Sequence, residues 1–181
     1  PYRSISSGVE LMIGQSQVFL ETLQLVEKIA HCEAPVLIEG ETGTGKELVA
    51  RAIHYGSNRQ KYPFVPVNCG AIPDLLVENE LFGHRRGAYT DAQSDSSGLI
   101  SQAQQGTLFL DEVDTLTPKA QVTLLRFLQD QLYRPLGASG TQAANVRIVV
   151  ASNADLIQLA EQGVFRMDLL FRIKIMYLKL P

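Results

Sequence analysis

The chain has 181 residues, of which 45% are hydrophobic and 19% charged, and it carries a formal net charge of −3. This size and composition are typical of a single globular domain with a substantial core. The slightly acidic balance excludes the strong basic field that binds nucleic acid, so we expect any DNA contact to lie in another segment. No apolar run reaches the length of a membrane span and no secretory leader is recognisable, which favours the cytoplasm.

The two cysteines, Cys32 and Cys69, do not have the spacing of a metal site, and we expect both to stay reduced. The chain starts at Pro1 without a methionine and ends at Pro181 directly after an apolar run. We therefore expect it to be one piece of a longer protein.

In chain order, apolar strands alternate with amphipathic helices. Helices are predicted at 16–32, from about residue 45, at 72–82, up to about residue 104, from residue 117 and at 155–162. Strands are predicted at 35–40, 64–68, 106–112, 146–151 and 173–180. This alternation predicts an α/β fold with a parallel sheet, and Pro66 indicates that its strand lies at an edge. The polar segment 83–98 predicts a long exposed loop or hairpin.

Helical spacing also predicts which side chains are buried. On the first helix the predicted buried side consists of Val18, Leu25, Val26 and Ile29. The helix predicted from residue 117 begins at Thr117 and Pro118, because proline suits the first turn of a helix, where the backbone N–H has no partner within the helix. Its predicted buried side consists of Val122, Leu125, Leu128 and Leu132.

A glycine-rich loop follows the first strand and opens a helix. Its residues are Gly40, Glu41, Thr42, Gly43, Thr44, Gly45, Lys46 and Glu47. The glycines let backbone N–H groups turn toward a polyphosphate, and Lys46 adds positive charge near the β- and γ-phosphates. The helix that begins near Gly45 directs its positive dipole end to the same place. These features predict a phosphate-binding loop, although Glu47 stands where such loops usually have a magnesium-binding Ser or Thr.

The strand 106–112 ends in two acids, Asp111 and Glu112. A buried parallel strand delivers such residues to the edge of the sheet where ligands bind. Asp111 is predicted to hold Mg²⁺, directly or through water, and Glu112 to polarise the attacking water. The alternative is a strand that merely ends in solvated acids.

Asparagines end two further apolar strands, at Asn68 and Asn153. At the same sheet edge, Asn153 would sense the γ-phosphate or orient water, and Asn68 would hold Glu112 in a resting orientation. The equally open alternative is that both asparagines simply start turns.

Arg166 and Arg172 flank a short segment that contains Asp168. Arginines beside a nucleotide fold can act on the γ-phosphate held by a neighbouring subunit. The alternative is an ordinary charged helix face paired with Asp168.

Several motifs occur in one order along the chain. They are residues 40–47, Val67-Asn68-Cys69, Glu80-Leu81-Phe82-Gly83-His84, residues 106–112 and the segment from Phe165 to Arg172. Together they closely resemble the central AAA+ ATPase domain of the sigma-54-dependent, NtrC-type bacterial transcription activators. The resemblance extends from Ile13 to Pro181. It implies a P-loop NTPase with a five-stranded parallel sheet sandwiched by helices, which binds ATP or ADP with Mg²⁺. It further implies a ring that remodels RNA polymerase holoenzyme containing sigma-54.

The resemblance assigns a role to each motif. Lys46 resembles the Walker A lysine, and Asp111 and Glu112 resemble the Walker B pair. The family normally has glutamate at the position of Glu47. Asn68 corresponds to the residue that restrains the catalytic glutamate, and Asn153 to the first sensor. Arg166 and Arg172 correspond to the arginines offered in trans to the adjacent subunit. Ile13 and Gly14 fall where the backbone of the family borders adenine.

The resemblance also sets the expected limits of the domain. Residues 1–181 form the nucleotide-binding α/β subdomain, and the helical lid with its second sensor lies beyond Pro181. A receiver domain of a two-component response regulator and a DNA-binding helix-turn-helix would likewise lie outside this segment.

The loop that touches sigma-54 in this family, GAFTGA, aligns here with Gly87, Ala88, Tyr89, Thr90, Asp91 and Ala92. Tyrosine for phenylalanine keeps the aromatic face. Aspartate for glycine adds a charge and restricts the backbone. Two alternatives to an active sigma-54 activator therefore stay open. One is a regulator of the same family that no longer engages sigma-54, and the other is an unfoldase-like AAA+ ring.

Overall fold

The computed structural model describes residues 16–180, and a five-stranded sheet with the order β2-β5-β8-β1-β9 lies at its centre. Every neighbouring pair of strands is parallel. The strands are β1 (Val36–Glu39), β2 (Phe64–Asn68), β5 (Thr107–Asp111), β8 (Arg147–Ser152) and β9 (Met176–Lys179). The predicted α/β architecture with a parallel five-stranded sheet is confirmed, and β2 lies at an edge as Pro66 indicated.

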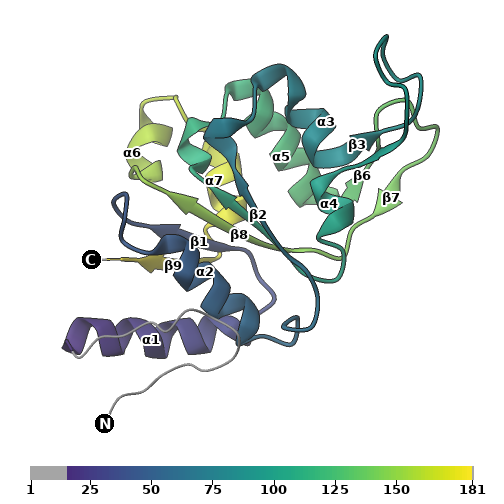
Figure 1. Cartoon of the computed structure of the whole chain (residues 1–181). Coiled ribbons are helices and arrows are strands. Elements are labelled where there is room, and N and C mark those ends of the chain that lie inside the picture. The colour runs from purple at the N-terminus through teal and green to yellow at the C-terminus, as the bar shows by residue number, and fades with distance from the viewer. Residues whose placement is uncertain (1–15, 181) are drawn as a thin grey trace.

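Helices cover both faces of this sheet (Figure 1). The first face carries α1 (Gln17–Ala30) and α2 (Lys46–Tyr55), whose apolar side chains pack with Val36, Ile38, Phe109 and Val149. The second face carries α3 (Val77–Phe82), α4 (Leu99–Gln102), α5 (Pro118–Asp130), α6 (Leu156–Glu161) and α7 (Met167–Ile173). Burial on both faces explains why the central strands β1, β5 and β8 read as continuous apolar runs.

Local side-chain hydrogen bonds fix where several helices begin. Ser16 Oγ accepts from the N–H of the third residue of α1, and Thr117 Oγ1 does the same at α5. Asp155 caps α6 by accepting from two backbone N–H groups. These caps satisfy N–H groups that have no partner within the helix.

The other end of α1 is held by a buried arginine from the sheet. Arg147 is 1% exposed, and its guanidinium donates to the carbonyls of Ile29 and Ala30 at 2.7 and 3.0 Å. A cation at a helix C-terminus is favourable because the last carbonyls carry partial negative charge. The contact fixes α1 against the start of β8.

Two short hairpins project from the second face. One is formed by β3 (Gly83–His84) and β4 (Ser96–Ser97), the other by β6 (Leu132–Tyr133) and β7 (Gln142–Ala143). The first confirms the hairpin predicted for 83–98, whereas the second was not predicted. The remaining short elements are the 3₁₀ turns η1 (Cys69–Ala71), η2 (Asp74–Leu76) and η3 (Val113–Thr115).

Backbone hydrogen bonds join the two hairpins. Leu136 N–H donates to Gly83 O, and Arg85 N–H donates to Leu136 O, both at 2.9 Å. Further out, a Cβ at Gly137 would lie 2.9 Å from the Ala88 side chain. The two loops consequently project side by side, at the upper right of Figure 1.

The predicted buried face of α1 is wrong in part. Val26 and Ile29 are buried as predicted, but Val18 and Leu25 are 53% and 39% exposed. The helix has turned so that Leu23 and Ala30 join the core instead. Packing against α2 and β9 decides this rotation, which the helical repeat alone left open.

The end of α5 was also predicted incorrectly. Leu125 and Leu128 are buried, but Val122 is only half-buried and Leu132 is 46% exposed in β6. The helix stops because Gln131 adopts a left-handed conformation with φ 53°. The buried side of α5 instead contains Ala120, Gln121, Thr123, Leu124, Leu125, Phe127 and Leu128.

Two elements begin several residues later in the structure than the sequence predicted. The helix predicted at 72–82 begins only at Val77, because η2 occupies the residues after Pro73. The strand predicted at 173–180 begins at Met176, because Ile173 is still the last residue of α7.

Candidate nucleotide-binding site

The carboxyl ends of the strands bring most of the predicted site residues to one edge of the sheet. Asn68 ends β2, Asp111 ends β5, Asn153 follows β8 and Gly40 follows β1. Asn68 lies directly opposite Asp111 in the register of their strands. Because the strands are parallel, the glycine loop, the acid pair and both asparagines share the edge where open parallel sheets bind ligands.

Two of the three glycines in the loop adopt a left-handed backbone conformation. Gly43 and Gly45 have φ values of 87° and 85°, which favour glycine over any residue with a side chain. Thr44 closes the turn, since its N–H and Oγ1 both donate to Glu41 O, at 3.3 and 2.8 Å. The exposed members of the loop are Glu41, Thr42, Gly43 and Glu47.

Lys46 is the first residue of α2 and is only 6% exposed. Its ammonium group donates to Gly40 O and Glu41 O, both at 2.8 Å. An ammonium group has three donors, so one N–H remains to meet an anion at the mouth of the loop. The loop therefore holds the lysine where the helix dipole also attracts negative charge.

Glu47, the next residue of α2, pairs with an arginine of the same helix. Its Oε1 accepts from Arg51 Nη2 and Nε at 2.7 and 3.0 Å, one helical turn along α2. The Arg51 guanidinium also lies over the Phe64 ring, 4.8 Å from its centroid. The carboxylate is thus part of an exposed ion pair with Arg51 on α2.

The acid pair forms a sharp turn at the end of β5. Glu112 adopts a left-handed conformation with φ 54°, and its N–H donates to Asp111 Oδ1 at 2.9 Å. Thr115 supports the turn by donating from Oγ1 to Glu112 O at 2.7 Å. Burial raises the pKa of the Asp111 carboxyl above its ordinary value, opposed by the Glu112 N–H and by nearby Lys46.

The side chains of Asn68 and Glu112 both lie close to Gly70. A Cβ added at Gly70 would lie 2.8 Å from Glu112 Oε2 and 3.2 Å from Asn68 Oδ1. The backbone of η1 thus makes room for both side chains. Cys69 is buried in the same turn, and burial together with the neighbouring acids raises the pKa of its thiol to about 12. Within the described part of the chain both cysteines are free thiols, as predicted.

Two acids that the sequence reasoning missed also belong to this edge. Asp114 Oδ1 accepts from Ser152 Oγ and from Asn153 N–H, at 3.0 and 3.1 Å. Glu39 is 5% exposed and accepts from Tyr177 Oη at 2.7 Å and from Leu156 N–H at 3.3 Å. The position of Glu39 directly before the glycine loop was the one sequence signal that could have drawn attention to it.

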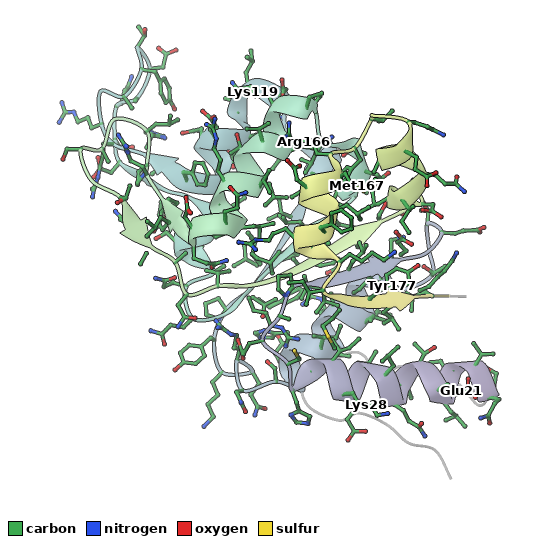
Figure 2. The ribbon with its side chains drawn as sticks, turned by 180° about the vertical axis from the view of Figure 1, so that it is seen from behind. Glu21, Lys28, Lys119, Arg166, Met167 and Tyr177 are labelled. Carbon is green, nitrogen blue, oxygen red and sulfur yellow. The ribbon has the colours of Figure 1, made fainter. Side chains whose placement is uncertain are left out.

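Arg166 and Arg172 lie at opposite ends of α7, and both are exposed. Arg166 forms a bidentate ion pair with Asp168, in which Nε donates to Oδ1 at 3.0 Å and Nη2 donates to Oδ2 at 2.7 Å. This is the pairing that the sequence offered as the alternative to a role in trans. Its N–H also donates to Gln121 Oε1 on α5 at 2.8 Å. Figure 2 shows Arg166 at one end of α7, close to the start of α5.

The loop 87–92 forms the tip of the first hairpin. Gly87 has φ 80°, and its N–H donates to Ala92 O at 2.9 Å, which closes the tip. Ala92 is 6% exposed, whereas Tyr89 is 46% exposed and its ring contacts His84 edge-on at 5.1 Å. Asp91 is exposed at the turn itself. The tip presents an aromatic side chain and a carboxylate to solvent.

Ile13 and Gly14, predicted to border adenine, lie outside the described residues. Within residues 16–180, no group of three or more His, Cys, Asp or Glu side chains forms a metal cluster. Mg²⁺ in nucleotide sites usually has one or two protein carboxylates and takes its other ligands from phosphates and water. Asp111, half-buried at the strand end, fits that donor set. No helix between residues 16 and 180 is long and apolar enough to cross a membrane.

Three features together define an AAA+ P-loop NTPase fold. They are the glycine loop with its buried lysine, strand β5 with two acids at its end, and strand β8 followed by an asparagine. Comparison with known proteins agrees, because residues 12–179 match the family described as the Sigma-54 interaction domain. The chain therefore belongs to this family, the AAA+ domains of NtrC-type sigma-54 activators.

The most similar proteins include two bacterial regulators. The chain is 45% identical over 170 residues to the regulatory protein AtoC of Escherichia coli K12, covering 94% of this chain and 37% of AtoC. It is 46% identical over 170 residues to the DNA-binding transcriptional regulator NtrC of a Bradyrhizobium strain, covering 94% of this chain and 35% of NtrC. The chain thus spans little more than a third of the length of these relatives.

A solved structure of NtrX from Brucella abortus in complex with ATP superimposes with a TM-score of 0.86 at 34% identity. The match covers 96% of this chain and 37% of NtrX. The predicted family and fold are therefore confirmed by comparisons of sequence and of structure.

Proposed function

We propose that this domain binds and hydrolyses ATP, and that in the whole protein the hydrolysis remodels RNA polymerase holoenzyme containing sigma-54. The observation that carries the proposal is the buried Lys46, held by the carbonyls of the glycine loop at the same sheet edge as Asp111 and Glu112. The ATP complex of the similar protein NtrX supports the choice of nucleotide.

Each side chain at this edge has a role in the proposal. Lys46 and the loop N–H groups bind the β- and γ-phosphates. Asp111 would hold Mg²⁺, which neutralises phosphate charge when bound. Glu112 orients the attacking water and accepts its proton, while Asn68 restrains that carboxylate across Gly70 and Asn153 senses the γ-phosphate.

The proposal includes self-association into a ring. Arg166 and Arg172 are exposed on α7, where they can be offered to the γ-phosphate of a neighbouring subunit. An arginine supplied in this way is worth about 10³–10⁵ in rate. Residues 1–181 alone, as an α/β subdomain without the lid, should therefore bind nucleotide and turn it over slowly. DNA contacts are assigned to parts of the protein outside this segment.

Nucleotide titration of a Lys46→Ala variant tests the proposal. The variant should lose most of its affinity for MgATP, because the phosphates lose their main cationic partner. Lys119→Ala is the matched control, since Lys119 is exposed on α5. Equal affinity in the Lys46 variant and the control would refute the assignment.

A second candidate function rests on Asp91. Its exposed carboxylate at the hairpin tip favours a regulator of the same family that keeps nucleotide binding but does not engage sigma-54. Pressing this tip against a partner requires the charge to be desolvated or paired.

The two candidates differ in the behaviour of a full-length Asp91→Gly variant. On the second candidate, glycine strengthens sigma-54 binding in the presence of an ATP transition-state mimic and leaves ATP turnover unchanged. Tyr89→Phe serves as the control, because it changes the same tip without altering charge. Tight binding by the parent protein, with no gain from glycine, would rule out the second candidate.

A further inference from the structure

Asp114 lies between the two strand ends that the proposed function uses. It belongs to η3, the turn that directly follows Asp111 and Glu112. Its Oδ1 accepts the backbone N–H of Asn153 at 3.1 Å and faces Ser152 Oγ at 3.0 Å. One carboxylate oxygen therefore joins the turn after β5 to the end of β8.

This contact lies where the sheet itself no longer joins the two strands. The paired register of β5 and β8 ends at Leu110 and Val150. Beyond that pair the two segments carry Glu112 and Asn153, the side chains that must be placed relative to each other. Here the backbone hydrogen bonds between the two strands have ended, and the Asp114 carboxylate accepts a hydrogen bond from the Asn153 N–H instead. A hydrogen bond to a charged acceptor is stronger than one to a neutral acceptor.

The two hydrogen bonds to Asp114 Oδ1 differ in whether their donor has a competing acceptor. The Asn153 N–H has a fixed direction and a single acceptor, Asp114 Oδ1. The Ser152 hydroxyl has one proton, and Ala154 O competes for it at 2.8 Å. The backbone of Asn153 is therefore the principal group that Asp114 holds.

The held residue faces the glycine loop. Asn153 is exposed, and it lines a cleft of about 380 Å³ together with Gly40, Glu41 and Asp155. A shift of its backbone would displace the side-chain amide within this cleft. Since catalytic groups must be placed within a fraction of an ångström, the backbone anchor matters for the rate.

We propose that Asp114 is a positioning residue that fixes Asn153 relative to the Asp111–Glu112 turn. This inference rests on the proposed function, because it assigns Asn153 to the γ-phosphate. Asp114 touches no substrate in this scheme, and it acts through Asn153 alone. The link also means that movement of the acid turn is transmitted directly to Asn153.

The first test uses hydrogen exchange and needs no activity. In the full-length protein, Asp114→Ala should speed exchange at the Asn153 amide, because its acceptor is removed. Asp114→Asn retains an Oδ1 acceptor and should keep most of the protection. Asp130→Ala, an exposed acid at the end of α5, is the control. Unchanged exchange at Asn153 in the alanine variant would overturn the proposal.

The second test uses ATP turnover of the assembled protein. Asp114→Ala should lower kcat about tenfold or more, as expected for the loss of a hydrogen bond to a charged group. The affinity for nucleotide should stay within about threefold, and Asp114→Asn should recover most of the rate. If nucleotide affinity falls as much as kcat, or if asparagine gives no recovery, Asp114 has only a structural role.

A double variant shows whether the effect passes through Asn153. Asp114→Ala combined with Asn153→Ala should have the kcat of Asn153→Ala alone, because one contact cannot be lost twice. Additive losses would overturn the proposal. If the parent protein has no ATP turnover, the proposed function fails, while the exchange measurement still decides whether Asp114 holds Asn153.

Discussion

Stability of the domain should depend on pH through one buried histidine. His54 on α2 is 0% exposed, and its Nδ1 lies 2.9 Å from Thr107 Oγ1 at the start of β5. Within residues 16–180, its Nε2 has no hydrogen-bond partner. Burial is the main cause that lowers the pKa of this imidazole to about 4; the nearby backbone of Tyr62 opposes the shift, and the charges of Arg147 and Arg51 add to it.

The sign and size of the effect follow from this pKa. The unfolded chain binds a proton near pH 6.5 but the folded chain does so only near pH 4. The stabilising contribution is therefore complete above pH 6.5 and is lost as the pH falls toward 4. Each unit between the two pKa values is worth about 1.36 kcal/mol, so the complete loss is about 3 kcal/mol.

Urea unfolding at pH 7.5 and pH 4.5 measures this loss. Carboxylates titrate over the same range, so the informative quantity is the difference between the parent chain and a His54→Asn variant. Asparagine stays neutral and keeps a polar atom near Thr107. Acidification should destabilise the parent by about 2.5 kcal/mol more than the variant. Equal losses would show that His54 is not held neutral by the fold.

The remaining predictions concern the candidate active site. Glu112→Gln should retain nucleotide binding and stop turnover, because the shape is kept while the proton acceptor is lost; normal turnover in the assembled protein would require another base. Asp111→Ala should weaken the dependence of binding on Mg²⁺, measured by titration with and without the metal. Arg166→Ala should lower turnover of the assembled protein by about 10³-fold or more while the stability of a single chain hardly changes. A monomer that hydrolyses ATP briskly would contradict this last reasoning.

The order of elements could be predicted from the sequence because the pattern of each strand is unambiguous. The central strands β1, β5 and β8 are buried on both faces and read as short apolar runs. Pro66 even identified the edge strand. The ends of the elements were harder, because Gln131 terminates α5 in a left-handed conformation that its residue type does not indicate.

The rotation of the helices could not be predicted with the same accuracy. Val18 and Leu25 have helical spacing with Val26, yet they face solvent. A helical repeat with apolar residues on more than half of the surface allows several buried faces, and tertiary packing selects one. The second hairpin was missed because its strands, β6 and β7, are too short to show a period.

The candidate site was largely predictable because a parallel sheet collects the ends of its strands. Asn68, Asp111 and Asn153 could be placed together from this rule alone. Asp114 could not, because its partners at the end of β8 are distant in sequence and its own position reads as an ordinary turn acid. Contacts between side chains and distant backbone leave no local pattern.

The joined hairpins have a consequence for how the proposed contact of the tip with a partner can be altered. Gly137 has φ 75°, and a side chain there would press against Ala88 in the neighbouring loop. The shape of the tip 87–92 is therefore encoded in two separate stretches of the gene. A change of specificity that alters one stretch must be compatible with the other. Libraries designed to retarget the tip should vary residues 134–141 together with 87–92, since a screen confined to one loop leaves the neighbouring loop that packs against it unchanged.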